Sequence, residues 1–300
     1  MLMRRVRAVV LSFVLIALLA SAAVCASFHF TVTADPRSSD VSYGKLLVQM
    51  KGKIKNQGVF QACLGDIDPP EKLRAKVDEV FGRSALWIPV VGNHDEMPNA
   101  MPWIRDEYSK GHDGRPSIKS RIKRGGPVGC ADTTYSFNFG NAHFIILNEY
   151  WDGGTKPGSD TAKGGRIVPA LCDWIKADLA ANKKPVVFVL GHEPAYPEHR
   201  HIKDSLDRDT ADRDAFWKLL ESKGVQAYFC GHTHYYSKHR QPHGRVWQVD
   251  AGSTRNADKN GNTFVNVTVT DKEVRYDVWR DADDTEKFAM EDTWREPIRH

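Results

Sequence analysis

The sequence shows no internal repeat and no long low-complexity run, and it lacks the local signatures of several enzyme classes. The sequence has no Walker A glycine loop, and this excludes the P-loop mode of nucleotide binding. It also has no GxSxG segment, and this excludes the serine elbow of many hydrolases. The stretch HEPAY at residues 192–196 does not match HExxH, so a zincin-type site is not supported. No linker-like stretch divides the 300 residues, so we expect one large domain.

Strong net charge is also missing once a leader is set aside. Residues 1–7 carry three arginines, an apolar run covers residues 9–24, and small residues follow, which is typical of a secretory signal peptide cut after Ala26. The alternative is an uncleaved membrane anchor, but the run is short for a spanning helix. Without residues 1–26 the formal charge falls from +4 to +1, because three arginines and no acid are removed. We therefore expect a periplasmic or secreted protein with no stable membrane anchor and no nucleic-acid partner.

Cysteine is scarce. The chain has five cysteines, and Cys25 leaves with the leader. Cys63 and Cys230 lie in apolar strand-like runs, which is typical of buried thiols. Cys130 is expected in a loop and Cys172 on a helix. Export permits disulfides, so a Cys130–Cys172 bridge is one pairing that the sequence leaves open.

Apolar strand-like runs alternate with helix-like segments along the rest of the chain. The early strand–helix–strand order predicts parallel pairing, while residues 134–148 predict a hairpin that turns at Gly140–Asn141. Apolar residues recur on one helical face within residues 168–182 and within residues 214–224. Strands are expected at residues 28–34, 59–64, 86–91, 134–139, 142–148, 186–190, 225–230, 246–250, 263–268 and 273–279.

These elements predict an α/β domain with mixed sheets over residues 27–280. Residues 281–300 are charged, and we expect them to form a peripheral tail. Residues 110–133 are glycine-rich and basic, and we expect a long loop there. Such a loop is either functional or a solvated basic face.

Polar side chains follow five of the expected strands. Four of the five places have the form of an apolar run, a glycine and a polar residue, and glycine permits a tight turn there. Sites in parallel α/β sheets form at the carboxyl ends of strands, so we expect these side chains to converge. Carboxylate, imidazole and amide oxygen without thiolate suit Mn, Fe, Zn or similar ions. The candidates are Asp35 in TVTADPR, Asp66 in CLGDID, Asn93, His94 and Asp95 in VVGNHDE, His192 in VLGHEP, and His232 and His234 in FCGHTH.

The series D, GD, GNHD, GHxP and GHTH resembles the calcineurin-like metallophosphoesterases, over roughly residues 28–250. That family includes purple acid phosphatases, serine/threonine protein phosphatases, nucleotidases and cyclic-nucleotide phosphodiesterases. The resemblance implies a four-layer α-β-β-α sandwich with two mixed β-sheets. It also implies a site for two metal ions at the sheet edge.

The resemblance further assigns the ligands of two divalent or trivalent ions, which would be Mn, Fe or Zn. Two such ions about 3.5–4 Å apart can clamp a phosphate and deprotonate a bridging water for in-line attack. The implied ligands are Asp66 for both ions, Asp35 and His234 for the first ion, and Asn93, His192 and His232 for the second. His94 would protonate the leaving oxygen or stabilise its charge, because an imidazole titrates near the working pH. Asp68 and Asp95 are candidates to orient His94.

Arg37 departs from the family pattern. Many members have a histidine two residues after the first aspartate, but an arginine has only hydrogen-bond donors and cannot be a metal ligand. Purple acid phosphatases instead have a tyrosine three residues after the aspartate of GD, and Pro69 stands there. Three possibilities for the first metal position stay open: weak occupancy, a ligand shell completed by solvent, and a substitute ligand from elsewhere in the chain. Arg37 is a candidate to grip a substrate phosphate bidentately, or to form a salt bridge with Asp40 or another loop acid.

The sequence therefore predicts a metal-dependent hydrolase of phosphoric esters, either a phosphomonoesterase or a phosphodiesterase. It would act outside the cytoplasm on a small phosphate ester through a metal-bridging hydroxide. The alternative is a non-catalytic metal- or phosphate-binding protein that retains the phosphoesterase fold. The missing ligand at Arg37 favours this alternative, while the retained His94 argues against it.

Overall fold

The computed structural model describes residues 27–298, apart from residues 56, 57, 59, 96–98, 109, 112–113, 157–163, 256–259 and 284. The expected leader, residues 1–26, lies outside the described residues. Within the described part, no helix combines the length and the apolar character that crossing a bilayer requires.

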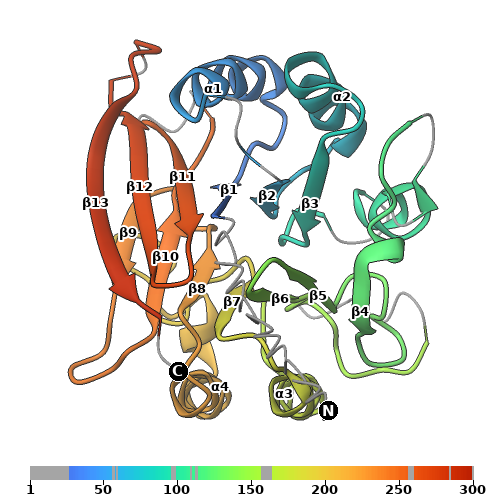
Figure 1. Cartoon of the computed structure of the whole chain (residues 1–300). Helices are drawn as coiled ribbons and strands as arrows, with labels where there is room; N and C mark the ends of the chain where they lie inside the picture. The colour runs from blue at the N-terminus through green and yellow to red at the C-terminus, as the bar shows by residue number, and fades with distance from the viewer. Residues whose placement is uncertain are drawn as a thin grey trace, which may run out of the picture.

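Two mixed sheets packed face to face, with helices on their outer sides, form a four-layer α-β-β-α sandwich (Figure 1). The first sheet has the strand order β13-β12-β11-β1-β2-β3, and the second has the order β4-β5-β6-β7-β8-β10-β9. Helices α1 and α2 cover the first sheet, and α3 and α4 cover the second (Figure 1). The predicted fold class is confirmed.

The bounds of the elements follow the chain in order. The helices are α1 (Asp40–Lys53), α2 (Pro70–Phe81), α3 (Pro169–Ala181) and α4 (Thr210–Ser222), with short helical turns at Trp103–Tyr108, Lys119–Arg121 and Leu206–Arg208. The strands are β1 (Phe28–Thr33), β2 (Phe60–Leu64), β3 (Leu86–Val90), β4 (Ile122–Gly125), β5 (Tyr135–Phe139), β6 (Ala142–Ile146), β7 (Val186–Leu190), β8 (Ala227–Cys230), β9 (Tyr236–His239), β10 (Trp247–Ala251), β11 (Asn262–Val269), β12 (Glu273–Asp281) and β13 (Ala289–Pro297).

Aromatic side chains join the two sheets. Phe30 on β1 stacks on Phe60 of β2, with ring centroids 5.1 Å apart, and its edge meets Phe144 of β6 in the second sheet at 5.2 Å. Buried aromatic pairs contribute about 0.5–1.5 kcal/mol beyond the area that they bury. The strands that carry the site therefore rest on a packed core that both sheets share.

The predicted pairings are present. Strands β1, β2 and β3 run parallel, and β5 and β6 form the antiparallel hairpin, with Phe139 opposite Ala142. Helix α3 buries Leu171, Ile175 and Leu179 against the second sheet, as its periodicity predicts.

Two expectations from the sequence are wrong, and one pairing that the sequence left open is not formed. Residues Ala289–Pro297, expected in a peripheral tail, form the edge strand β13, which pairs with β12. The expected loop at residues 110–133 contains a helical turn and β4, which pairs with β5. The Cys130–Cys172 bridge is not formed, because the four cysteines of the described residues are all free thiols.

Candidate metal centre

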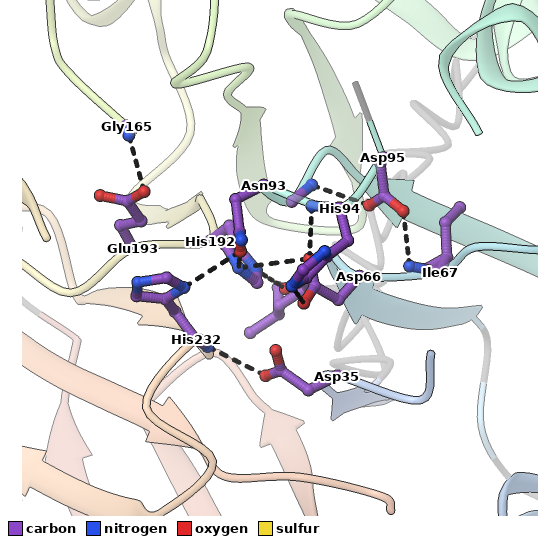
Figure 2. A network of polar contacts seen from close by, with 12 residues as sticks. Asp35, Asp66, Ile67, Asn93, His94, Asp95, Gly165, His192, Glu193 and His232 are labelled. Atoms are coloured by element: carbon purple, nitrogen blue, oxygen red, sulfur yellow. Dashed lines mark hydrogen bonds and ion pairs between the residues drawn. The ribbon is translucent and has the colours of Figure 1, made fainter. Parts of the chain in front are cut away.

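The candidate ligands follow five strands and meet at the edge where the parallel strands end (Figure 2). In the first sheet, Asp35 follows β1, Asp66 follows β2 and Asn93 follows β3. The second sheet supplies His192 after β7, and His232 and His234 after β8. The structure brings together all six residues that the sequence proposed as ligands.

Distances among these side chains define a compact centre. The potential ligand atoms of Asp35, Asp66 and His192 all lie within 4.8 Å of one another. His192 Nε2 is 3.7 Å from Asp66 Oδ1, and His234 Nε2 is 3.5 Å from Asp35 Oδ1. Asn93 Oδ1 lies 3.2 Å from both His192 Nε2 and His232 Nδ1.

The turns that aim these side chains are strained or tightly packed. Asp35, Asp66, His232 and His234 all have positive φ angles between 55° and 70°, a region that non-glycine residues rarely adopt. Such strain persists only where the surrounding structure imposes it, and it is concentrated at functional sites. Gly65, which precedes Asp66, has φ +86°, and a Cβ there would collide with the imidazole of His192. The glycine in GD is thus needed for close approach as well as for the turn.

The backbone fixes the orientation of His192. Its Nδ1 donates a hydrogen bond to the carbonyl oxygen of Leu64 at 2.6 Å. A metal-bound histidine usually donates its other ring nitrogen in this way, which leaves Nε2 to face the ion. Here Nε2 points at the oxygens of Asp66 and Asn93.

A buried acid holds the loop behind His192. Glu149 Oε2 accepts hydrogen bonds from the backbone N–H groups of His192 and Glu193, at 2.9 and 2.7 Å, and Glu149 Oε1 accepts one from the hydroxyl of Tyr228. Glu193 accepts a hydrogen bond from the backbone N–H of Gly165 at 2.6 Å (Figure 2). The sequence reasoning did not identify either glutamate. Glu193 is part of the GHEP segment and could have been identified from it, but no local sequence pattern indicates a role for Glu149.

The electrostatics of the centre favour a cation. Burial lowers the pKa of His192, but the carboxylates of Asp66 and Asp35 outweigh this effect and raise the pKa to about 9. Asp35 Oδ1 is buried and has no hydrogen-bond partner. Burial, with the imidazoles of His192 and His201, lowers the pKa of His232 to about 2, so this ring stays neutral. A set of oxygen and nitrogen donors with surplus negative charge fits Mn, Fe or Zn.

His94 lies on the open side of the centre. Its backbone N–H donates to Asp66 Oδ1 at 3.0 Å, its Nε2 is 3.9 Å from Asp66 Oδ2, and its side chain is 41% exposed. Burial lowers its pKa, and the charge of Arg37 lowers it further against the opposing effect of Asp66. This position suits a group that meets a substrate.

Asp95 does not orient His94, contrary to one expectation. Its buried carboxylate accepts the backbone N–H groups of Ile67 and Gly92 instead, at 2.7 and 2.8 Å (Figure 2). Among the described residues, no hydrogen bond joins the His94 ring to Asp95 or Asp68. Asp95 therefore ties the loop after β2 to the loop after β3.

Arg37 is half-buried beside the centre. Its Nε is buried and has no hydrogen-bond partner, and its charge acts on His94. Within the part of the chain described here, Arg37 forms no ion pair with Asp40, so that alternative is not supported. The Nε–H donor of Arg37 is therefore unsatisfied among the described residues.

A loop that the sequence reasoning missed covers the two histidines after β8. Arg200 Nη1 lies 2.7 Å from His234 Nδ1, and the ring of His201 is 4.1 Å from the ring of His232. The cluster EHRH at residues 198–201, three residues after GHEP, was the available signal.

A two-sheet sandwich with such ligands at its strand ends is the architecture of the metallophosphoesterases. The family model for calcineurin-like phosphoesterases matches residues 63–236, so the chain belongs to this family of phosphoric ester hydrolases.

Two curated relatives agree with this assignment. The chain is 27% identical over 168 residues to the "probable inactive purple acid phosphatase 9" of Arabidopsis thaliana, covering 49% of this chain and 24% of the relative. It is 26% identical over 187 residues to an acid phosphatase of Aspergillus ficuum, covering 49% of this chain and 28% of the relative. The chain thus spans about a quarter of the length of these relatives. A dimetal phosphatase from Danio rerio shares the fold, with a TM-score of 0.63 at 14% identity, covering 91% of this chain and 99% of that one.

Proposed function

We propose that the protein is a metal-dependent hydrolase of small phosphoric esters. The observation that carries the proposal is the meeting of two carboxylates, three imidazoles and an amide oxygen at one sheet edge. These ligands are Asp35, Asp66, Asn93, His192, His232 and His234. When bound, the ions neutralise phosphate charge and activate a water molecule for attack on phosphorus.

The residues of the chain would divide the remaining tasks. Asp66 has an oxygen within reach of both halves of the centre, so it would link the two metal positions. Arg37 would hold a non-bridging phosphate oxygen through its unpaired donor. His94, on the open side, would donate a hydrogen bond or proton from its ring to the leaving oxygen.

The place of action is part of the proposal. The leader-like residues 1–26 support action outside the cytoplasm, in the periplasm or after secretion. Mass spectrometry of the protein purified from its native compartment tests this step. We expect a mature chain that begins at Ser27.

The test of the activity joins elemental analysis to a substrate screen. Purified protein is assayed on chromogenic phosphomonoesters and phosphodiesters with added Mn, Fe or Zn. We expect bound metal and turnover in the wild type, and loss of both in Asp66→Ala. Asp173→Ala, which removes an exposed acid on α3, is the matched control and should retain both. Full metal content with normal turnover in Asp66→Ala would overturn the assignment.

A non-catalytic role is the second candidate. Arg37 in a usual ligand position favours it, as does the name of the Arabidopsis thaliana relative. The same screen separates the two functions, because this candidate predicts metal and inorganic phosphate binding without turnover of any ester.

A further inference from the structure

In two histidines of the centre, His234 and His192, the Nδ1 atoms have opposite hydrogen-bonding roles. Arginine has five N–H donors and no acceptor, so Arg200 must donate to Nδ1 of His234, 2.7 Å away. A neutral imidazole that accepts at Nδ1 carries its hydrogen on Nε2. In His192 the roles are reversed, because Nδ1 donates to the carbonyl of Leu64.

This difference decides which nitrogen can bind a cation. A ligand nitrogen must offer a lone pair, and Nε2 of His192, which faces Asp66 and Asn93, can offer one to a cation because Nδ1 keeps its hydrogen for Leu64. Nε2 of His234 instead carries the hydrogen, and it lies 3.5 Å from Asp35 Oδ1 without a hydrogen bond to that oxygen. His234 therefore becomes a metal ligand through Nε2 only when Arg200 withdraws.

The loop holds Arg200 in place. The backbone N–H of Arg200 donates to the carbonyl of Glu198 at 2.7 Å, and the residues on either side, His199 and His201, have φ angles of 66° and 57°. The carbonyl of His201 accepts hydrogen bonds from the backbone of Asp204 at 3.0 Å and from the hydroxyl of buried Ser205 at 3.0 Å. Arg200 is thus positioned by its loop.

We propose that Arg200 makes the metal position of Asp35 and His234 the weaker of the two. Its guanidinium holds His234 in the tautomer that does not bind metal, and its charge opposes a second cation. Arg37, two residues after Asp35, offers no ligand to this position. The position is weakened but still present, because Oδ1 of Asp35 is buried and has no hydrogen-bond partner. This inference rests on the proposed metal centre.

Metal titration tests the proposal without an activity assay. Metal-stripped protein is titrated with Mn²⁺ by calorimetry, and bound metal is counted after equilibrium dialysis. We expect one tight ion and one that binds at least tenfold more weakly in the wild type, the weaker one at the position of Asp35 and His234. Arg200→Met removes the donor and the charge at similar length, and it should tighten the weaker ion about tenfold or more, since a hydrogen bond to a charged group is lost from the competing state.

A matched control separates local contact from general charge. Lys203→Met removes a positive charge from the same exposed loop without touching His234, and it should leave both affinities unchanged. Two ions of equal affinity in the wild type, or an unchanged second affinity in Arg200→Met, would overturn the inference while leaving the proposed function intact. Absence of any bound ion would overturn the proposed function itself.

Discussion

His94 is the side chain best placed to act on a leaving group. We predict that His94→Ala keeps its metal, because the ring is no ligand of the centre, and that it slows hydrolysis of unactivated esters by about 10²–10⁴-fold. The loss should shrink for esters with acidic leaving groups, since these depart without a proton. Measuring kcat/KM across a series of aryl phosphates, with metal content in parallel, checks this. Equal losses across the series would contradict the acid role.

Arg37 offers a second test at the scale of a single residue. If its unpaired Nε holds phosphate, Arg37→Ala should lower kcat/KM by about tenfold or more, because a charge-assisted hydrogen bond contributes roughly 1.5–3 kcal/mol. Metal affinity should stay the same. Arg37→His restores a ligand type at this position and should tighten the first metal. Steady-state kinetics with Mn²⁺ titration of both variants measures the two effects, and unchanged values in both would make Arg37 a bystander.

The loops after β2 and β3 depend on each other through Asp95. Its carboxylate is fully buried and satisfies two backbone N–H groups, those of Ile67 and Gly92. Asp95→Ala leaves both donors buried and unpaired, at a cost of about 1–3 kcal/mol each. We predict a lower free energy of unfolding in urea and weaker metal binding. Asp95→Asn keeps one acceptor oxygen and should lose about half as much; an Asp95→Ala protein as stable as wild type would refute the clamp.

The strand ends were predictable because their signals are local. An apolar run, a glycine and a polar residue mark a strand that stops at an edge, and parallel order brings such edges together. The roles of Arg200 and Glu149 were not predictable, because each acts on a residue 34 or 43 positions away through a fold that no local pattern shows. Tautomers of buried histidines likewise depend on tertiary partners.

Edge strand β13 was missed for a different reason. Its segment, AMEDTWREP, is rich in charged residues and largely exposed, so its composition resembles that of a solvated tail. Its place is set by Trp294, which stacks on Tyr276 of β12 with ring centroids 4.5 Å apart. Exposed edges carry little hydrophobic signal, whereas central strands carry much. Strand β4, which lies within a basic stretch, was missed for the same reason.

At the scale of the whole molecule, the proposed metal centre would link the two sheets. Asp35, Asp66 and Asn93 belong to the first sheet, while His192 and His232 belong to the second. An ion that is held by ligands from both sheets would bind the native state, because the unfolded chain has no preformed site. Binding to the native state alone raises stability by mass action.

This linkage gives a prediction for thermal unfolding. With free Mn²⁺ at 100 times its Kd, the gain is about 2.7 kcal/mol. For a chain of this size, each kcal/mol shifts Tm by about 2–4 °C, so chelation should lower Tm by about 5–10 °C. Asp66→Ala should start at the lower Tm and respond little to chelator, because it lacks the shared ligand. Differential scanning calorimetry with and without EDTA measures both shifts. A wild-type Tm that ignores chelation would mean that the two sheets are held together by their aromatic core alone, without help from an ion at their common edge.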